Sequence, residues 1–418
     1  MELGLERHDD RLQTDWPATR DEGLRRLDAF AQRMGSHYRS HRNRDSGPGR
    51  RDNVSLLSPY IARRLVTEAE AVDAALARHR PSTCEKFVQE VVWRTYFKGW
   101  LEIRPSVWLD YRTGLDRDLS MLKADEALAV DIERAETGQT GIEAFDVWAR
   151  ELVETGYLHN HARMWFASIW CFTLGLPWRI GADFFLRHLL DGDAASNTLG
   201  WRWVAGLHTQ GKNYAATASN IAKYTDDRLG GPLTATGLAR NPVPLDEGPL
   251  PPRGTLRHVP PLRVNEGVAV LLTTEDLGVE SLGLPSTVRD VATLQLTHRR
   301  SPRAVSDMVA AFDRIALDDA AARVGTNSTV QLADEDLPQA LVKWAQRVGA
   351  STVVTGYLNT GWVRDRLLDA APALAAANID FREVQRPWDA VFHPYCTAGF
   401  FKVKKEIPAI LASLGHAC

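Results

Sequence analysis

The sequence predicts a chain of two parts, in which an all-α domain comes first and a doubly wound α/β domain follows. Three observations support this prediction. Residues 1–226 carry apolar side chains at helical spacing, residues 227–265 are rich in Gly and Pro, and residues 266–418 alternate apolar runs with helical patterns. A chain of 418 residues is long enough for two or three domains. We therefore expect a helical domain over 1–226, an exposed linker over 227–265 and an α/β domain over 266–418.

Helical periodicity recurs along the first part. Apolar residues lie three or four positions apart over 24–31, 84–103 and 142–156, which is typical of amphipathic helices. The apolar run from Met164 to Leu176 is shorter than the roughly 20 residues that span a bilayer. It predicts one buried core helix.

The second part alternates strands and helices. Apolar runs predict buried strands over 267–275, 292–298 and 350–358, and helical patterns lie over 302–323, 336–348 and 362–377. This alternation is typical of a parallel sheet covered by helices. No GxGxxG follows a strand, so the sequence lacks a dinucleotide-binding fingerprint of the Rossmann type.

Composition limits the classes of function. The formal net charge is −3, so no global excess of positive charge indicates a nucleic-acid partner. The four cysteines have no CxxC spacing, which argues against a zinc site or an iron–sulfur cluster and suits a reducing cytoplasm. The N-terminal residues lack the apolar core of a signal peptide. We expect a cytoplasmic protein without a membrane partner or a bound metal.

Polar residues cluster around the predicted buried helix. Asn160 and Arg163 are three positions apart and share a helix face. Two carboxylates, an amide and two indoles follow within thirteen positions: Asp191, Asp193, Asn197, Trp201 and Trp203. Burying so many polar groups is unfavourable unless they bind something polar. The stretch from Glu154 to Gly206 is therefore the candidate site.

Three upstream segments allow more than one interpretation. Eight arginines lie between Arg33 and Arg64, which fits either a solvated helix and loop or a local phosphate-binding surface. The loop SLLSPY fits a simple helix cap or an anion site at a helix start. In the helix over 84–103, aromatic residues on one face fit core packing, and Glu90 fits a surface acid paired with Arg94 four residues later.

Three motifs together resemble the flavin-binding core of the photolyase/cryptochrome family. ETGYLHNHARM at 154–164 and DGDAASNTLGWRW at 191–203 are similar to that family's TGxxHNRxRM and DGDxAxNxGGWQW. Upstream, SLLSPYI at 55–61 and KFVQEVVWRTYF at 86–97 are similar to its SRLSPYL and (F/W)xxExxWRxFY. The motifs occur in the family's order over about 200 residues.

The resemblance implies FAD as cofactor and assigns a set of flavin contacts. In the family the loop at Val54 to Ser58 holds the pyrophosphate, and two aspartates bond the flavin ring and its hydroxyls. The implied set is Tyr38, Val54, Ser55, Leu56, Leu57, Ser58, Phe87, Glu90, Arg94, Asn160, Arg163, Asp191, Asp193 and Asn197. Asn197 matches the position beside flavin N5, where an amide cannot deliver a proton as a carboxylic acid can.

The resemblance also implies a set of residues that contact the substrate. Glu90 matches the carboxylate that hydrogen-bonds a DNA lesion, and Trp93 matches the indole that stacks on a flipped pyrimidine dimer. Trp203 and His161 are implied in the same set. His161 stands where the family usually has an Arg that contacts DNA, and this difference weakens the repair interpretation.

An electron-transfer chain is implied in part. Trp201 matches the family's flavin-proximal tryptophan and Trp178 the middle one. The distal tryptophan falls near Leu122 and has no counterpart there. Trp108, Trp148 or Trp170 could replace it.

The second part resembles, more weakly, the family's antenna domain. The segments 270–278 and 353–384 are similar to its first and last elements, and 392–408 to the tail that ordinarily leads into the flavin domain. The order is reversed from the usual one, as in a circular permutation. The charged antenna turn is altered to TTEDLG, so an antenna chromophore is not expected.

Three hypotheses of function follow. The first is a light-driven DNA repair enzyme that splits pyrimidine dimers, with damaged DNA as partner. The second is a cryptochrome-like blue-light photoreceptor that acts through a signalling partner and has no repair activity. The third is a light-independent interaction protein that keeps the flavin pocket as a relic. The first is the leading hypothesis.

Overall fold

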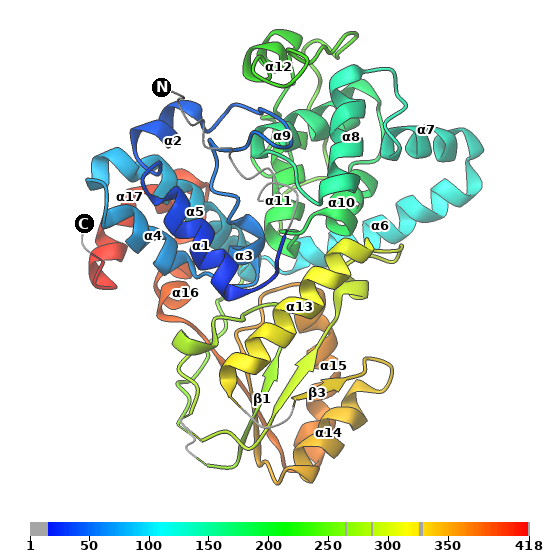
Figure 1. Cartoon of the computed structure of the whole chain (residues 1–418). Helices are drawn as coiled ribbons and strands as arrows, with labels where there is room; N and C mark the ends of the chain where they lie inside the picture. Colours follow the sequence, from blue (N-terminus) through cyan, green and yellow to red (C-terminus); the bar gives the residue numbers. More distant parts are fainter. Residues whose placement is uncertain (1–15, 264–265, 286, 326–328, 417–418) are drawn as a thin grey trace, which may run out of the picture.

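The predicted fold class is confirmed by the computed structural model. It describes residues 16–263, 266–285, 287–325 and 329–416, so Cys418 and the linker positions 264–265 lie outside the described residues. Helices α1 to α12 gather in one half of the molecule, and a parallel sheet with three covering helices forms the other half (Figure 1).

The helical half is built from helices of very different length. Their bounds are α1 Arg20–Ala31, α2 Ser36–His41, α3 Ser58–Ala62, α4 Glu68–Leu76, α5 Pro81–Glu102, α6 Ser106–Ala124, α7 Glu126–Glu136, α8 Glu143–Thr155, α9 Asn160–Ser168, α10 Trp178–His188, α11 Ala194–Ala205 and α12 Ala218–Tyr224. The longest is α5, which packs against α2, α4 and α11. Within the described ranges no helix is both long and apolar enough to cross a bilayer.

Local signals explain several helix ends near the centre of this half. Pro81 begins α5, where a missing N–H is tolerated. A capping box of Thr67 and Glu70 begins α4. Asp193 caps α11, and Gly206, with φ of 84°, ends it in the left-handed conformation that favours glycine.

The predicted single helix from Met164 to Leu176 is wrong in its second half. α9 ends at Ser168, and a π-helical turn, η2, covers Ile169–Thr173. The apolar pattern fitted a helix because the π-turn buries Ile169, Trp170 and Cys171 as an α-helix would. π-turns within helices are uncommon and often lie near functional sites.

Within the part of the chain that the structure describes, the sheet contains five parallel strands in the order β3-β2-β1-β4-β5. The strands are β1 Val268–Leu272, β2 Val291–Leu294, β3 Thr329–Leu332, β4 Thr352–Gly356 and β5 Asp380–Val384, with helices α13 Asp307–Val324, α14 Leu337–Arg347 and α15 Trp362–Ala376 and short 3₁₀ turns η3 Val279–Ser281 and η4 Thr297–Arg300. Val270 pairs with Val291 of β2 and with Val354 of β4. The three predicted strands are the central ones.

Apolar periodicity predicted neither edge strand, β3 or β5, although the segment 353–384, which resembles the last elements of the antenna domain, contains β5. β5 has the sequence DFREV and is only partly buried, so it lacks the apolar run that marks a central parallel strand. β3 is four residues long and contains Gln331. Strands at the edge of a sheet need fewer apolar residues, and sequence periodicity misses them for that reason.

The chain returns to the helical half after the sheet. Helices α16 Pro387–Phe392 and α17 Phe400–Ser413, with the 3₁₀ turn η5 His393–Tyr395 between them, pack against α5. In Figure 1 the C-terminal α17 lies beside the N-terminal helices. The last part of the predicted α/β domain therefore packs with the helical domain.

The predicted exposed linker is irregular but is attached to the helical half along much of its length. Leu233 and Ala235 are buried. The Glu247 carboxylate accepts hydrogen bonds from Trp178 Nε1 (2.9 Å) and Arg202 Nη1 (2.9 Å). The Gly and Pro content predicted irregular backbone correctly, whereas the attachment depends on side chains far away in sequence.

Candidate functional site

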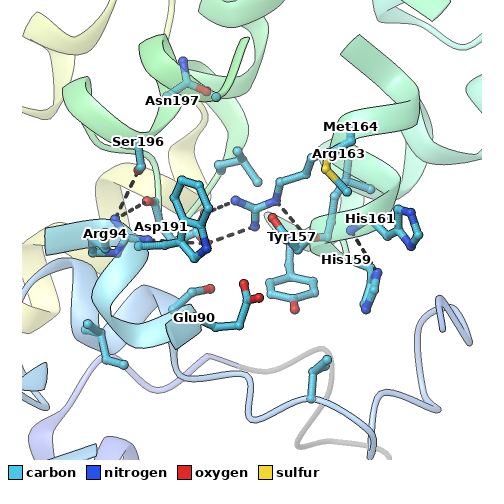
Figure 2. Close-up of a pocket in the computed structure, with 18 of the residues that line it drawn as sticks. Glu90, Arg94, Tyr157, His159, His161, Arg163, Met164, Asp191, Ser196 and Asn197 are labelled. Carbon is cyan, nitrogen blue, oxygen red and sulfur yellow. Dashed lines mark hydrogen bonds and ion pairs between the residues drawn. The ribbon is translucent and has the colours of Figure 1, made fainter. Parts of the chain in front are cut away.

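A cavity of about 630 Å³ lies between α5, α9, α11 and the loop that precedes α3. All but two of the predicted site residues line it: Tyr38, Val54, Ser55, Leu56, Leu57, Ser58, Phe87, Glu90, Trp93, Arg94, Asn160, His161, Arg163, Asp191, Asn197, Trp201 and Trp203. Asp193 and Trp178 do not line it. Figure 2 shows Glu90, Tyr157, Arg163 and Asp191 gathered around its centre.

Asp191 and Arg163 form the strongest polar pair in the cavity wall. Arg163 Nη1 and Nη2 donate to the two carboxylate oxygens of Asp191 at 3.0 and 2.9 Å, in a bidentate arrangement. Burial alone raises the pKa of Asp191, but Arg163 and Arg94 outweigh it and lower this pKa to about 2. The pair therefore stays charged at neutral pH.

Asp193 serves the protein itself and does not face the cavity. Its Oδ1 accepts from the backbone N–H groups of Ala195 (3.0 Å) and Ser196 (2.8 Å), and its Oδ2 pairs with Arg94 and with the Ser196 hydroxyl. This carboxylate caps α11 and fixes Arg94, which does line the cavity. The direct contact of Asp193 with a cofactor stays a prediction.

Glu90 pairs with Arg42 and not with Arg94. Arg42 Nη1 donates to Glu90 Oε1 at 2.6 Å. The predicted pairing with Arg94 along α5 is wrong because Arg94 turns toward Asp193. Burial raises the pKa of Glu90, and Arg42 and Lys86 lower it in part, so that the net shift is upward. A carboxyl group with a raised pKa can hold a proton closer to neutral pH than an ordinary glutamate.

His161 has both ring nitrogens engaged within the protein. Its Nδ1 lies 3.1 Å from the carbonyl oxygen of Asn43, and its Nε2 lies 3.3 Å from the Tyr214 hydroxyl. Its ring stacks on Trp165 with centroids 4.1 Å apart. Tyr214 in turn stacks on Trp203, at 5.6 Å. His161 therefore borders the cavity as part of an aromatic stack.

The loop before α3 has an unusual backbone. Leu56 has φ of 54°, which is rare for a side chain of this kind and marks a fixed turn. The Leu57 N–H donates to the Ser55 hydroxyl at 3.4 Å, and no side chain caps the start of α3. The loop lines the cavity from Val54 to Ser58.

The arginine-rich segment is not a free phosphate-binding surface. Arg51, Arg63 and Arg64 are buried and paired with carboxylates. Arg42 pairs with Glu90, and Arg44 pairs with Asp226. Carboxylates neutralise most of these side chains, which leaves little charge to bind phosphate. The solvated-helix interpretation is incomplete as well, because three of the arginines are buried.

One side of the cavity has polar atoms and open space. The Asn197 amide Nδ2 donates to the Ala182 carbonyl at 2.9 Å. The indole N–H of Trp201 is buried and, among the described residues, has no hydrogen-bond acceptor. A methyl group added at Gly200 would meet no atom within 4 Å. This wall can therefore accommodate a ligand that accepts a hydrogen bond.

Trp201 and Trp178 contact different aromatic side chains. The Trp201 ring lies 6.1 Å from Trp170, edge to face. Trp178 lies 5.8 Å from Tyr111, which lies 5.4 Å from Trp108. Trp170 and Trp108 were candidates for the missing distal tryptophan. Trp170 contacts Trp201 directly, whereas Trp108 reaches Trp178 through Tyr111. Trp148 stacks on Trp165 instead.

Several lining residues escaped prediction. Arg42, Tyr157 and His159 line the cavity beside predicted ones. Arg42 is four positions after Tyr38, and His159 directly precedes Asn160, so helical spacing and adjacency were signals for both. Tyr157 contacts Arg163 through its ring face, with the guanidinium 5.6 Å from the centroid. Nothing in the sequence distinguished this tyrosine from a core residue.

Comparison with known proteins identifies the region that forms this cavity. Residues 87–227 match the model of the family described as the FAD binding domain of DNA photolyase. The deoxyribodipyrimidine photo-lyase of Streptomyces griseus is 40% identical over 159 residues, which cover 38% of this chain and 33% of that protein. A deoxyribodipyrimidine photo-lyase of Thermus thermophilus is 35% identical over 190 residues, 45% of this chain and 43% of that protein. The Cryptochrome DASH of Natronomonas pharaonis is 28% identical over 232 residues, 52% of this chain and 46% of that protein.

The helical half that carries the cavity is thus an FAD-binding domain of the DNA photolyase type. Over this region the chain is similar to members of the photolyase/cryptochrome family, as its motifs predicted. It spans between a third and about half of the length of these relatives.

The residues of the cavity fit the group that such a domain holds. A volume of about 630 Å³ lies within the range of roughly 300–1,000 Å³ that is usual for cofactor pockets. The orphaned indole N–H of Trp201 and the open space at Gly200 are features that a bound group would satisfy and fill. The polar side of the pocket is supplied by Arg42, Arg94 and Arg163 and by Ser55 and Ser58 of the loop before α3.

Proposed function

We propose that this chain is an FAD-dependent, photolyase-like flavoprotein that repairs pyrimidine dimers in DNA by light-driven electron transfer. The observation that carries the proposal is the position of Glu90 and Trp93, one helical turn apart on α5, in the wall of the cavity that the flavin motifs form. A base flipped out of a DNA strand needs a flat apolar surface to stack on and a polar group to bond its edge. Trp93 and Glu90 supply these two groups.

The proposed roles divide between the two sides of the cavity. Bound FAD supplies a light-excitable electron donor. Ser55, Ser58 and the backbone of the loop over 54–58 bind the pyrophosphate, while Arg163 and Asp191, with Tyr38, Phe87, Arg94 and Asn160, hold the flavin. Asn197 is a neutral amide and cannot donate a proton as a carboxylic acid would.

Glu90 is the residue that can handle a proton on the substrate side. Burial raises the pKa of this carboxyl group, and the ion pair with Arg42 at 2.6 Å offsets part of that rise. We expect the lesion to compete with Arg42 for this carboxyl group. Trp203 and His161 border the same side of the cavity.

Electron supply to the flavin forms a further part of the proposal. Trp201 lines the cavity, and Trp178 lies outside it. We propose that both serve flavin reduction, with Trp170 or Trp108 in place of the missing distal tryptophan. The ring contacts of 6.1 Å between Trp201 and Trp170, and of 5.8 and 5.4 Å from Trp178 through Tyr111 to Trp108, support this assignment.

A blue-light photoreceptor without repair activity is the second candidate. Two observations favour it. His161, at the position where the family usually has a DNA-contacting Arg, has both ring nitrogens engaged inside the protein. Most arginines between 33 and 64 are paired with carboxylates and leave little free positive charge near the cavity. A photoreceptor would need a signalling partner in place of damaged DNA.

We also propose that the α/β part is an antenna-like domain permuted to follow the flavin domain, and that it binds no antenna chromophore. Ligands of parallel sheets bind at the carboxyl ends of the strands where the strand order reverses, here between β1 and β4. Side chains of the protein fill this position: Lys98 pairs with Glu275 at 3.6 Å, and Asn359 donates to Glu275 at 3.1 Å. The packing of α17 on α5 supports the permutation, because it joins the segment that follows the sheet to the helical half.

An absorption spectrum of the purified protein, before and after blue light with a reductant, is the deciding experiment. We expect flavin bands that bleach in the light. Added DNA with pyrimidine dimers should lose them only in the light. Bleaching without loss of dimers would favour the photoreceptor, and absence of flavin would contradict both proposals and leave the interaction protein.

Replacing Glu90 separates repair from photoreduction. We expect Glu90→Gln to lower the repair rate by roughly 10- to 100-fold, because the carboxyl group that bonds the lesion is lost, while photoreduction stays within about twofold. Repair is measured as loss of dimers per unit of light dose. Glu85→Gln, on the exposed face of the same helix, is the matched control and should repair as the wild type does. Full repair by Glu90→Gln would show that this residue is assigned wrongly.

A further inference from the structure

The first residue of the C-terminal helix lies flat against the cavity tryptophan. The rings of Phe400 and Trp93 have centroids 3.8 Å apart and planes inclined by 12°, the closest ring contact in the described residues. Phe400 is buried, with 4% of its surface exposed. Trp93 lines the cavity and Phe400 does not. Phe400 of α17 therefore covers one face of the indole. Trp93 faces the cavity with the part of its surface that Phe400 does not cover.

The segment that carries Phe400 is hydrogen-bonded to α5 and to the residues just after it, on the C-terminal side of Trp93. The Tyr96 hydroxyl donates to the Ala398 carbonyl at 2.9 Å, and Arg104 Nη2 donates to the Thr397 carbonyl at 3.2 Å. Ahead of it, Trp388 Nε1 donates to the Thr95 hydroxyl at 2.9 Å.

The Tyr96 ring also meets both stacked rings edge-on. Its centroid lies 5.4 Å from that of Trp93 and 5.6 Å from that of Phe400. Edge-to-face contacts of this kind are favourable for aromatic pairs. The Trp93 indole is therefore contacted by Phe400 on its face and by Tyr96 from the side.

A fixed indole binds a planar ligand better than a mobile one. An unrestrained tryptophan would lose rotamer freedom when a base stacks on it, and this loss weakens binding. Phe400 removes that freedom before the ligand arrives, because its ring occupies the space into which the indole would turn. The restraint comes from the opposite end of the chain, about 300 residues from Trp93 in sequence.

We infer that Phe400 is a positioning residue for Trp93 and that the C-terminal segment from Thr397 to Phe400 supports the cavity wall from outside the cavity. The ligand class is a planar nucleobase that stacks on the free face of the indole. The identity of this ligand rests on the proposed function. The positioning of Trp93 by Phe400 does not depend on it.

The positioning is tested without any ligand by near-ultraviolet circular dichroism of the purified full chain. The difference between wild type and Trp93→Phe gives the signal of the Trp93 ring in its fixed environment. We expect this difference to fall by at least about half in a Phe400→Leu background, since Leu fills most of the volume but offers no ring to stack on. It should persist with Phe400→Tyr, which restores a ring. Phe401→Leu is the matched control, because Phe401 is the next residue in the chain and its side chain is 77% exposed.

Binding is tested in the dark with a short single-stranded oligonucleotide that contains one thymine dimer. We expect Phe400→Leu to bind it about 2- to 10-fold more weakly, with unchanged flavin content, and Phe400→Tyr to recover. If Phe400→Leu fails to fold, Phe400→Met serves in both measurements.

An unchanged Trp93 signal in Phe400→Leu would overturn the inference. So would equal weakening by Phe401→Leu. If the wild type binds no dimer-containing DNA, the proposed repair function fails, while the spectroscopic comparison still decides the role of Phe400.

Discussion

His159 shows how one buried side chain couples the cavity wall to pH. Its Nδ1 accepts the backbone N–H of His161 at 3.2 Å and so caps α9, and its Nε2 lies 3.0 Å from the Arg42 carbonyl, which can only accept. These contacts require the neutral ring with its proton on Nε2. Burial, the largest influence, lowers the pKa of His159 to about 4. Folding therefore favours the neutral form.

The consequence is a loss of stability in mild acid. Below pH 6.5 the unfolded chain binds a proton at His159 that the folded chain does not, so stability falls as pH drops from 6.5 toward about 4 and is full above 6.5. We expect this residue to contribute about 2 kcal/mol to the loss between pH 7 and pH 5. His159→Asn keeps a capping acceptor without the titration. Urea unfolding of this variant should show a smaller drop between the two pH values than the wild type shows.

The control is the exposed His258→Asn, which should leave the pH dependence of unfolding as it is in the wild type. An identical drop for His159→Asn and wild type would contradict the assignment of a neutral, buried His159.

At the scale of single helices, two glycines on neighbouring helices have opposite surroundings. A Cβ atom at Gly181 in α10 would lie 2.4 Å from Trp201 Cη2 and 2.8 Å from Trp170 Cε2. A Cβ atom at Gly200 in α11 would lie in open space. Gly181 therefore permits the close contact of α10 with the two indoles, and Gly200 leaves room in the cavity.

Alanine at these two positions should give opposite results. We expect Gly181→Ala to destabilise the fold by about 1–3 kcal/mol, because rigid indoles must move. Gly200→Ala should stabilise the flavin-free fold by about 0.5–1 kcal/mol, as alanine does in helix interiors, and should lower flavin content by filling the cavity. Urea unfolding and the flavin absorbance per chain measure the two effects. Equal stability of Gly181→Ala and wild type would contradict the proposed close packing.

At the scale of the whole molecule, buried ion pairs join the helical half to the sheet and to the C-terminal helices. Arg64 has φ of 54° and is fully buried. Its guanidinium donates to Asp389 at 2.6 and 2.7 Å and to Asp276 at 3.2 Å, and it pairs with Glu68 at 3.1 Å. One side chain thus connects three segments that lie far apart in sequence. A second buried cluster joins Arg63 to Asp313 in the sheet half.

Removing Arg64 should weaken the attachment between the two halves. Arg64→Met leaves three buried carboxylates without their shared cation, and we expect a loss of about 3–5 kcal/mol in the free energy of unfolding. Limited proteolysis should also cut faster within 227–263. Arg314→Met, which breaks an exposed pair with Asp318, should change stability by less than about 0.5 kcal/mol. If both variants behave alike, the buried cluster does not hold the halves together.

The local signals in the sequence determined most of the elements and most of the cavity wall. The spacing of apolar residues indicated the central strands and the long helices, because periodicity depends only on which face of an element is buried. The spacing of Asn160, Arg163, Asp191 and Asn197 placed them correctly in one cavity. The edge strand β3 and the π-turn were missed, since neither has a distinctive local pattern.

Tertiary structure alone decided which charged groups pair and what covers the aromatic residues. Glu90 has Arg94 within one helical turn but pairs with Arg42. The Asp193 carboxylate accepts hydrogen bonds from the first backbone N–H groups of α11. Phe400 reaches Trp93 because the C-terminal helix folds back onto α5. Coulomb attraction and ring stacking act over a few ångströms in space, and separation along the chain carries no information about that distance. The sequence therefore determined which groups this protein has for its cavity, and the folded chain decided which of them remain free to bind a ligand.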